Sequence, residues 1–138
     1  MAALTGKGFM IWKVRDCEGG SPSLIKNVAL SAKFTNVLIK IADGTNAYNI
    51  VNSVDQAAPV VSTLKAAGIK VWGWHYIYGS DPAGEAAIAI SRVKNLGLNG
   101  YIIDAESEFE ASGMSTRAST FMTKLRAGLP STQVALSS

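Results

Sequence analysis

The stretch GYIIDAESEFE, residues 100–110, follows an apolar run with four carboxylates and decides between the two folds that this sequence allows. The run has the β-branched and aromatic character of a buried strand. Side chains two apart on a strand point to the same face, so we expect Asp104 and Glu106 on one face and Ile103 and Ala105 on the other. Two acids on one face of a buried strand need a polar space in front of them.

Similar apolar runs recur along the chain at a nearly constant spacing. They begin at Phe9, Val37, Ile69, Tyr101 and Gln133, so each starts 28 or 32 residues after the one before it. That interval is the length of a strand followed by a helix. The spacing therefore predicts five strands separated by four helices.

The segments between these runs carry the start and stop signals of helices. We expect helices over about residues 21–32, 59–68, 81–97 and 115–128. A proline stands at the start of the first three, and a glycine ends the last three, which is the arrangement that helix sterics favour. Four strand–helix units and a fifth strand predict a single α/β domain over residues 1–138, with a parallel sheet and right-handed crossovers.

Two architectures have this alternation, a doubly wound open sheet and part of a (β/α)8 barrel. Length favours the first, because a complete barrel needs about 250 residues and this chain has 138. Charges in the strands favour the second, because Lys13, Lys40 and Asp104 would be buried under helices in a doubly wound sheet. Around a barrel axis the charges can meet. We therefore predict a parallel (βα)4 unit plus a fifth strand, which is half of a TIM (β/α)8 barrel.

The barrel prediction places a polar mouth at the carboxyl ends of the strands, where barrel active sites lie. We expect Lys40, His75, Asp104 and Glu106 there. The Cα atoms of the two acids should lie about 6.6 Å apart along the strand, and such a pair suits glycoside hydrolysis. We predict that Glu106 is the general acid and that Asp104 is its ionised partner, held charged by Lys40. The two later glutamates of the stretch are expected to be solvated.

Other polar residues of the strands and their ends have two readings each. Lys13 and Asp16 are candidates for substrate contacts, but each of the two strand lysines can instead snorkel between helices, and Asp16 can cap a turn. His75 is the only histidine and can equally be a hydrogen-bonded core residue. Trp72, Trp74 and Tyr76 fall on the face opposite His75, where they could form a sugar platform, and we predict that they pack in the core instead.

Composition excludes several classes of function. The net charge of +3 is scattered along the chain, which does not indicate a nucleic acid or a membrane surface as partner. The single cysteine rules out an intrachain disulfide and a cysteine-based zinc site, and nothing indicates a cofactor or a metal. We find no apolar run of transmembrane length and no recognisable leader, so the location of the protein stays open.

Three motifs together resemble a known family. VLIKIADGT, GIKVWGWHYIYG and YIIDAE, over about residues 37–106, are similar in order and spacing to the second, third and fourth strands of family-25 glycoside hydrolases, the lysozyme-type muramidases. The resemblance implies an extracellular (β/α) barrel that cleaves the glycan of peptidoglycan, with Glu106 as proton donor, Asp104 as its partner carboxylate and Lys40 as the active-site lysine. The first strand, FMIWKV, lacks the aspartate that the family has there, and Asp16 follows it.

Two classes of function remain open at this point. The first is a glycosidase-like enzyme, or the N-terminal half of one, that acts on a cell-wall or related polysaccharide. The second is a non-catalytic barrel-derived domain for binding or assembly, in which the acid–lysine cluster is structural. An unrelated doubly wound domain is a third reading. Half of a barrel exposes two strand edges and an apolar interior, which natural proteins avoid, so we expect a homo-oligomer, such as a dimer, or a fragment of a longer chain.

Overall fold

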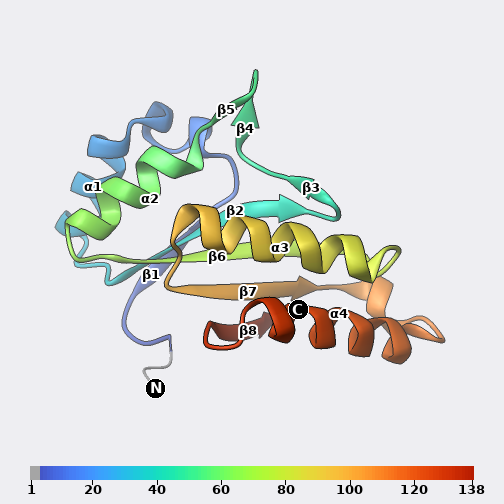
Figure 1. Cartoon of the computed structure of the whole chain (residues 1–138). Coiled ribbons are helices and arrows are strands. Elements are labelled where there is room, and N and C mark those ends of the chain that lie inside the picture. Colours follow the sequence, from blue (N-terminus) through green and yellow to red (C-terminus); the bar gives the residue numbers. More distant parts are fainter. Residues whose placement is uncertain (1–3) are drawn as a thin grey trace.

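The computed structural model describes residues 4–138 and contains a mainly parallel sheet covered by helices (Figure 1). The parallel strands are β1 (Gly8–Ile11), β2 (Asn36–Asp43), β6 (Lys70–Ile77), β7 (Gly100–Ala105) and β8 (Gln133–Ser137). The α-helices between them are α1 (Pro22–Ser31), α2 (Ala57–Ala66), α3 (Pro82–Leu96) and α4 (Met114–Gly128).

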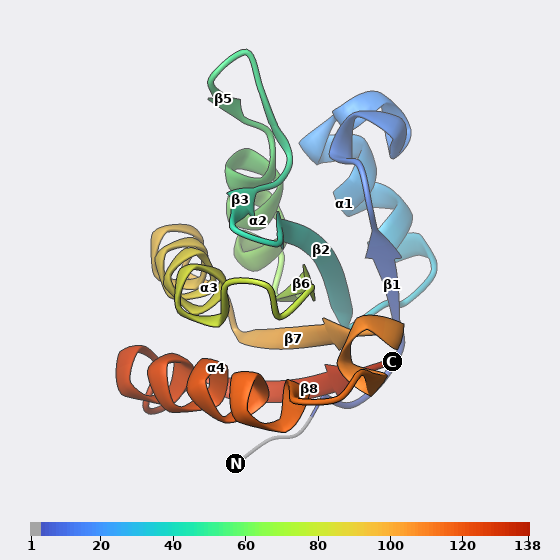
Figure 2. The ribbon, with the colours of Figure 1, turned by 90° about the vertical axis from the view of Figure 1, so that its right-hand side faces the viewer.

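The order of the strands in the sheet is the same as their order in the chain. Each strand pairs in parallel with the next, giving β1-β2-β6-β7-β8. Right-handed crossovers between successive neighbours place all the helices on one side, and the helices lie around the outside of the sheet (Figure 2). A doubly wound sheet would have helices on both faces. The predicted α/β fold, a half-barrel-like (βα) arrangement, is therefore confirmed.

The two faces of the sheet have separate apolar clusters. The larger one lies between the sheet and the helices and includes Ile39, Ile103 and Phe121. The smaller one lies on the opposite, inner face, where Trp72 and Trp74 are buried with Ile102. The two tryptophans are core residues on the face opposite the helices, as the alternation predicts. Tyr76, which was expected to join them, is only half-buried.

The helix signals read from the sequence act as expected. The hydroxyl of Ser21 accepts a hydrogen bond from the Leu24 amide at 3.3 Å, and the Asp81 carboxylate accepts one from the Gly84 amide at 3.0 Å. These two side chains cap the first turns of α1 and α3. Helix α3 ends at Gly97, which has a left-handed φ of 62° that glycine adopts without steric cost.

The connection between β2 and α2 contains elements that the sequence pattern did not predict. Strand β3 (Asn46–Ala47) pairs antiparallel with β2, and β4 (Ile50–Val51) and β5 (Val54–Asp55) form a hairpin. The two residues at the hairpin tip, 52 and 53, both have positive φ, as a two-residue hairpin turn of the primed type requires. Short 3-10 helices occur at η1 (Val14–Asp16), η2 (Glu18–Gly20) and η3 (Ser107–Glu110).

An arginine from α3 fixes this connection to the sheet. Arg92 is buried, and its guanidinium forms an ion pair with Asp55 at 2.5 Å. The same group donates to the carbonyl oxygens of Ile41 at 3.0 Å and Tyr48 at 3.1 Å. Because a buried guanidinium needs partners for all its donors, Arg92 holds the hairpin and its approach against the end of β2.

Candidate functional site

The carboxyl ends of three neighbouring strands place polar side chains side by side on the inner face. Asp43 at the end of β2 is in register with Tyr76 of β6, which in turn is in register with Asp104 of β7. This edge of the sheet is where parallel α/β folds bind their ligands. The candidate site is therefore the inner face at the carboxyl end of the sheet.

A β-bulge in β2 places Lys40 and Asp43 on the same face. In a regular strand, residues three apart point to opposite faces. Here the register with β6 shifts between Lys40 and Ala42, so one extra residue of β2 stands unpaired. The shift lets the Lys40 ammonium reach the Asp43 carboxylate at 2.5 Å. The ion pair at the mouth thus depends on the irregularity of the strand.

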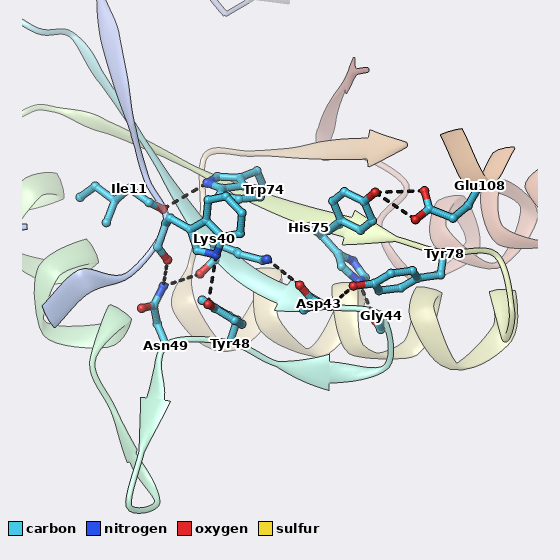
Figure 3. A network of polar contacts seen from close by, with 12 residues as sticks. Ile11, Lys40, Asp43, Gly44, Tyr48, Asn49, Trp74, His75, Tyr78 and Glu108 are labelled. Atoms are coloured by element: carbon cyan, nitrogen blue, oxygen red, sulfur yellow. Dashed lines mark hydrogen bonds and ion pairs between the residues drawn. The ribbon is translucent and has the colours of Figure 1, made fainter. Parts of the chain in front are cut away.

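Lys40 lies inside a cage of aromatic rings and is 1% exposed. Its Nζ lies 4.4 Å from the ring centroid of Tyr48, 4.7 Å from Trp12, 5.0 Å from Trp74 and 6.0 Å from Tyr76. Aromatic faces attract a cation and so offset part of its desolvation. Figure 3 shows the Lys40 side chain extended between Tyr48 and Trp74 toward Asp43.

Asp43 is held in its charged form by two donors. Lys40 bonds one carboxylate oxygen, and the Tyr78 hydroxyl donates to the other at 2.7 Å. Partial burial works against ionisation, but these hydrogen bonds and the lysine charge outweigh it and lower the pKa of Asp43. The hydrogen bond from the Tyr78 hydroxyl to Asp43, together with burial, raises the pKa of Tyr78 to about 12.

The carboxyl groups of Asp104 and Glu106 interact with each other. Asp104 is half-buried, and Glu106, just past the end of β7, is exposed. Burial raises the pKa of Asp104, the neighbouring Glu106 carboxyl raises it further, and Lys40 lowers it by a smaller amount. Lys40 favours the ionised form of Asp104, but its effect is smaller than those of burial and Glu106, and its ion pair is with Asp43. Asp104 therefore retains its proton to a higher pH than a solvated aspartate does.

Glu108 lies closer to this site than the sequence indicated. Its carboxylate accepts the hydrogen bond of the Tyr76 hydroxyl at 3.0 and 3.1 Å, and it is half-buried rather than solvated. Burial and this contact with Glu108 raise the pKa of Tyr76 to about 12. The link joins η3 to β6 and closes one side of the mouth, whereas Glu110 is exposed as predicted.

His75 does not belong to the mouth, where it was expected to contact substrate. Its ring is buried on the helix-covered side, with Nε2 2.7 Å from the Gly44 carbonyl oxygen and Nδ1 2.8 Å from the Tyr101 hydroxyl. Since the carbonyl only accepts, Nε2 carries the proton and Nδ1 accepts from Tyr101. Burial lowers the pKa of His75 to about 4. His75 lies between Trp74 and Tyr76 in β6, and consecutive residues of a strand point to opposite faces. The His75 side chain is therefore on the other face of the sheet from Lys40 and Asp104.

Lys13 and Asp16 line a different part of the molecule from the carboxyl pair. Strand β1 ends at Ile11, so Lys13 follows the strand instead of lying within it, and Asp16 lies in η1. Both side chains are exposed. They border a groove of about 660 Å³ that also includes Trp12 and Tyr48. This groove adjoins the aromatic cage of Lys40, because the rings of Trp12 and Tyr48 belong to both.

Asn49 joins the groove to the cage and was not predicted. Its side-chain oxygen accepts from the Val14 amide at 2.8 Å, and its amide group donates to the carbonyl oxygens of Trp12 at 3.0 Å and Lys40 at 2.8 Å. Figure 3 shows the two bonds that the Asn49 amide group donates. Its partners are 9 to 37 residues away in the chain, so no local pattern could have revealed it.

Residues 4–138 contain no cluster of three or more His, Cys, Asp or Glu side chains placed to hold a metal ion. None of their helices has both the length and the apolar character needed to span a bilayer. In comparisons with protein-family models and with curated protein sequences, nothing matches this chain. The resemblance to family-25 glycoside hydrolases therefore stays a prediction.

Proposed function

We propose that this chain is a glycoside hydrolase-like half-barrel that acts on a cell-wall or related polysaccharide through Asp104 and Glu106. The observation that carries the proposal is the raised pKa of Asp104, caused by burial and by the adjacent Glu106 carboxyl. A carboxyl group whose pKa is raised holds its proton to a higher pH than a solvated one, which is the property that a general acid needs. The pair also occupies the carboxyl end of a strand, where barrel enzymes carry their chemistry.

In the proposed reaction the pair acts as one proton-sharing unit. Glu106, the more exposed member, gives the shared proton to the glycosidic oxygen as the bond from that oxygen to the anomeric carbon breaks. The negative charge left on the pair then lies beside the oxocarbenium-like sugar and stabilises it. Water adds to the anomeric carbon and its proton returns to the pair, so that the products are two shorter sugars with free ends.

The aromatic cage favours the non-catalytic reading as a second candidate. Lys40 is enclosed by rings and paired with Asp43, so its charge is already satisfied within the protein. A cluster whose charges are satisfied in this way can stabilise the sheet without taking part in any reaction. In that case the domain would act in binding or assembly, and the exposed acids would have no chemical role.

The test is the substitution Glu106→Gln, with Glu110→Gln as the matched control. Both glutamates are exposed, so neither change should alter the melting temperature. Removing a general acid typically costs about 10²- to 10⁴-fold in rate. We expect Glu106→Gln to abolish release of reducing ends from peptidoglycan and Glu110→Gln to retain it.

The opposite pattern would support the structural reading. If the wild-type chain releases no reducing ends and Glu106→Gln lowers the free energy of unfolding by about 1 to 3 kcal/mol, the carboxyl pair is part of the fold and the hydrolase proposal is wrong.

A further inference from the structure

Trp12 combines high exposure with a fixed position. Its side chain is 61% exposed, whereas Trp72 and Trp74 are buried. Its indole N–H donates to the Tyr48 hydroxyl at 3.0 Å, and its ring meets Trp74 edge-on at a centroid distance of 5.8 Å. The Lys40 ammonium lies over the ring at 4.7 Å. Because the buried Lys40 lies over one face of the indole, we assign the exposed part of the ring to the other face, as far as residues 4–138 show.

The exposed face of Trp12 borders the groove that Lys13 and Asp16 line. The groove of about 660 Å³ has Met10, Trp12 and Tyr48 as apolar or aromatic surface. Lys13 and Asp16 supply an exposed donor and an exposed acceptor beside it. Small-molecule sites have this composition, a mainly apolar surface with a few polar groups that fix orientation.

The ligand that fits such a surface is a pyranose ring. A sugar ring presents a face of C–H groups, which packs on an aromatic ring, and a rim of hydroxyl or amide groups, which needs hydrogen-bond partners. A flat apolar ligand would not use the two charged side chains at the rim, and a simple ion would not use the indole face. The rigid support of Trp12 also means that little conformational freedom is lost when a ligand binds.

We propose that Trp12 is the stacking platform of a sugar-binding subsite, with Lys13 and Asp16 as hydrogen-bonding residues at its rim. The inference rests on the proposed function for its ligand class and extends it to a second position along the polysaccharide. Lys40 lies between the two positions, because its ammonium lies over Trp12 and bonds Asp43, which is in register with Asp104 through Tyr76. The proposal places the two positions along one chain of sugars.

The experiment measures binding of N-acetylglucosamine oligomers to the Glu106→Gln variant, in which binding is separated from cleavage. In a nitrogen–proton correlation spectrum we expect the indole N–H signal of Trp12 to shift on titration while those of the two buried tryptophans stay in place. Trp12→Ala should weaken binding by about tenfold and Trp12→Phe by less, because a smaller aromatic face remains. Leu24→Ala, which removes an exposed apolar side chain from α1, is the matched control and should have no effect.

The two proposals fail in different ways. Binding that requires Trp12, together with a wild-type chain that cleaves nothing, overturns the hydrolase proposal and supports the subsite. Hydrolysis that Glu106→Gln abolishes, together with unchanged binding in Trp12→Ala, overturns the subsite and supports the hydrolase. An unshifted Trp12 signal at saturating oligomer also overturns the subsite. Lys13→Ala and Asp16→Ala should each weaken binding by about threefold, and no change in either would remove them from it.

Discussion

The two faces of the sheet bury polar groups in different ways. On the helix-covered face His75 is neutral and bonded on both nitrogens to protein groups, and burial lowers its pKa to about 4. On the inner face Lys40 is equally buried but forms an ion pair with Asp43, which is partly open to water, and Asp104 next to it has a raised pKa. On the helix-covered face the polar groups of His75 are satisfied by other groups of the protein. The inner face keeps carboxyl groups that a ligand can reach.

The largest expected effect comes from breaking the closed face. His75→Leu leaves the Gly44 carbonyl and the Tyr101 hydroxyl buried without their partner. Each unsatisfied group costs about 1 to 3 kcal/mol, so the free energy of unfolding should fall by about 2 to 6 kcal/mol. Urea denaturation checks this result. Tyr101→Phe breaks one of the two bonds and should cost about half as much, and equal stability of His75→Leu and the wild type would contradict the assignment.

A pH series sharpens the same contrast. The folded-state pKa of His75 is lowered from 6.5 to about 4, so the unfolded chain takes up a proton at a higher pH than the folded one. The contribution of His75 to stability is complete above pH 6.5, declines as the pH falls toward 4 and is constant below pH 4. The loss should reach about 3 kcal/mol.

The His75→Leu variant isolates that loss from other titrating groups. Asp43 has a lowered pKa in the folded state, so its contribution to stability is lost only as the pH falls below 3.8, its pKa in the unfolded chain. Asp104 has a raised pKa in the folded state, so its contribution to stability increases as the pH falls. Both contributions remain in the variant, so the difference between the two unfolding curves should carry the decline between pH 6.5 and 4. A difference that is independent of pH would contradict the low pKa of His75.

On the inner face, Lys40→Met keeps the aliphatic stem in the aromatic cage and removes the charge. Breaking a fully buried ion pair costs about 3 to 5 kcal/mol; because water reaches Asp43, we expect about 2 kcal/mol here. The pKa of Asp43 should rise toward its usual value. Thermal unfolding measures the first effect and carboxyl NMR the second. Lys13→Met, which removes an exposed lysine nearby, is the control, and an equal loss in both variants would show that the cage has no special role.

The open edge of the sheet should give the smallest change in stability. Leu136 of β8 is 73% exposed beside an apolar groove of about 590 Å³ between β8 and α4. We propose that copies of the chain associate through this edge. Leu136→Lys should change the stability of the monomer by less than about 0.5 kcal/mol and lower the mass measured by light scattering. A wild-type mass that stays at 14.5 kDa at every concentration would contradict the proposal.

Sequence periodicity was sufficient for the layout of the sheet and for the acids of β7. The spacing of the apolar runs predicted the order of strands and helices, and alternation placed Asp104 opposite Ile103. The pairing register of β2 with β6 sets Lys40 opposite Trp74, so His75, the next residue of β6, points to the other face, and this register could not be read from either strand alone. Of the three charged residues that were placed in strands, Lys40 and Asp104 lie on the inner face, whereas Lys13 follows β1 and was wrongly included.

The composition of the site could not be read from the sequence. The bulge that brings Asp43 beside Lys40 depends on pairing with β6 and has no local pattern. The rings around Lys40 come from β6, from the residue after β1 and from the loop before the hairpin, which only tertiary packing brings together. Glu108 gains its role from the Tyr76 hydroxyl, 32 residues away.

The central claim is that the inner face, through burial and the neighbouring Glu106, raises the pKa of Asp104. A carbon-13 titration of the Asp104 carboxyl, in the wild type and in Glu106→Gln, tests it most directly. We predict a wild-type pKa above the ordinary 3.8 and a lower value in Glu106→Gln, because the neighbouring negative charge is gone while burial remains. An Asp104 that titrates at or below 3.8 in the wild type, unchanged by the substitution, would contradict the account.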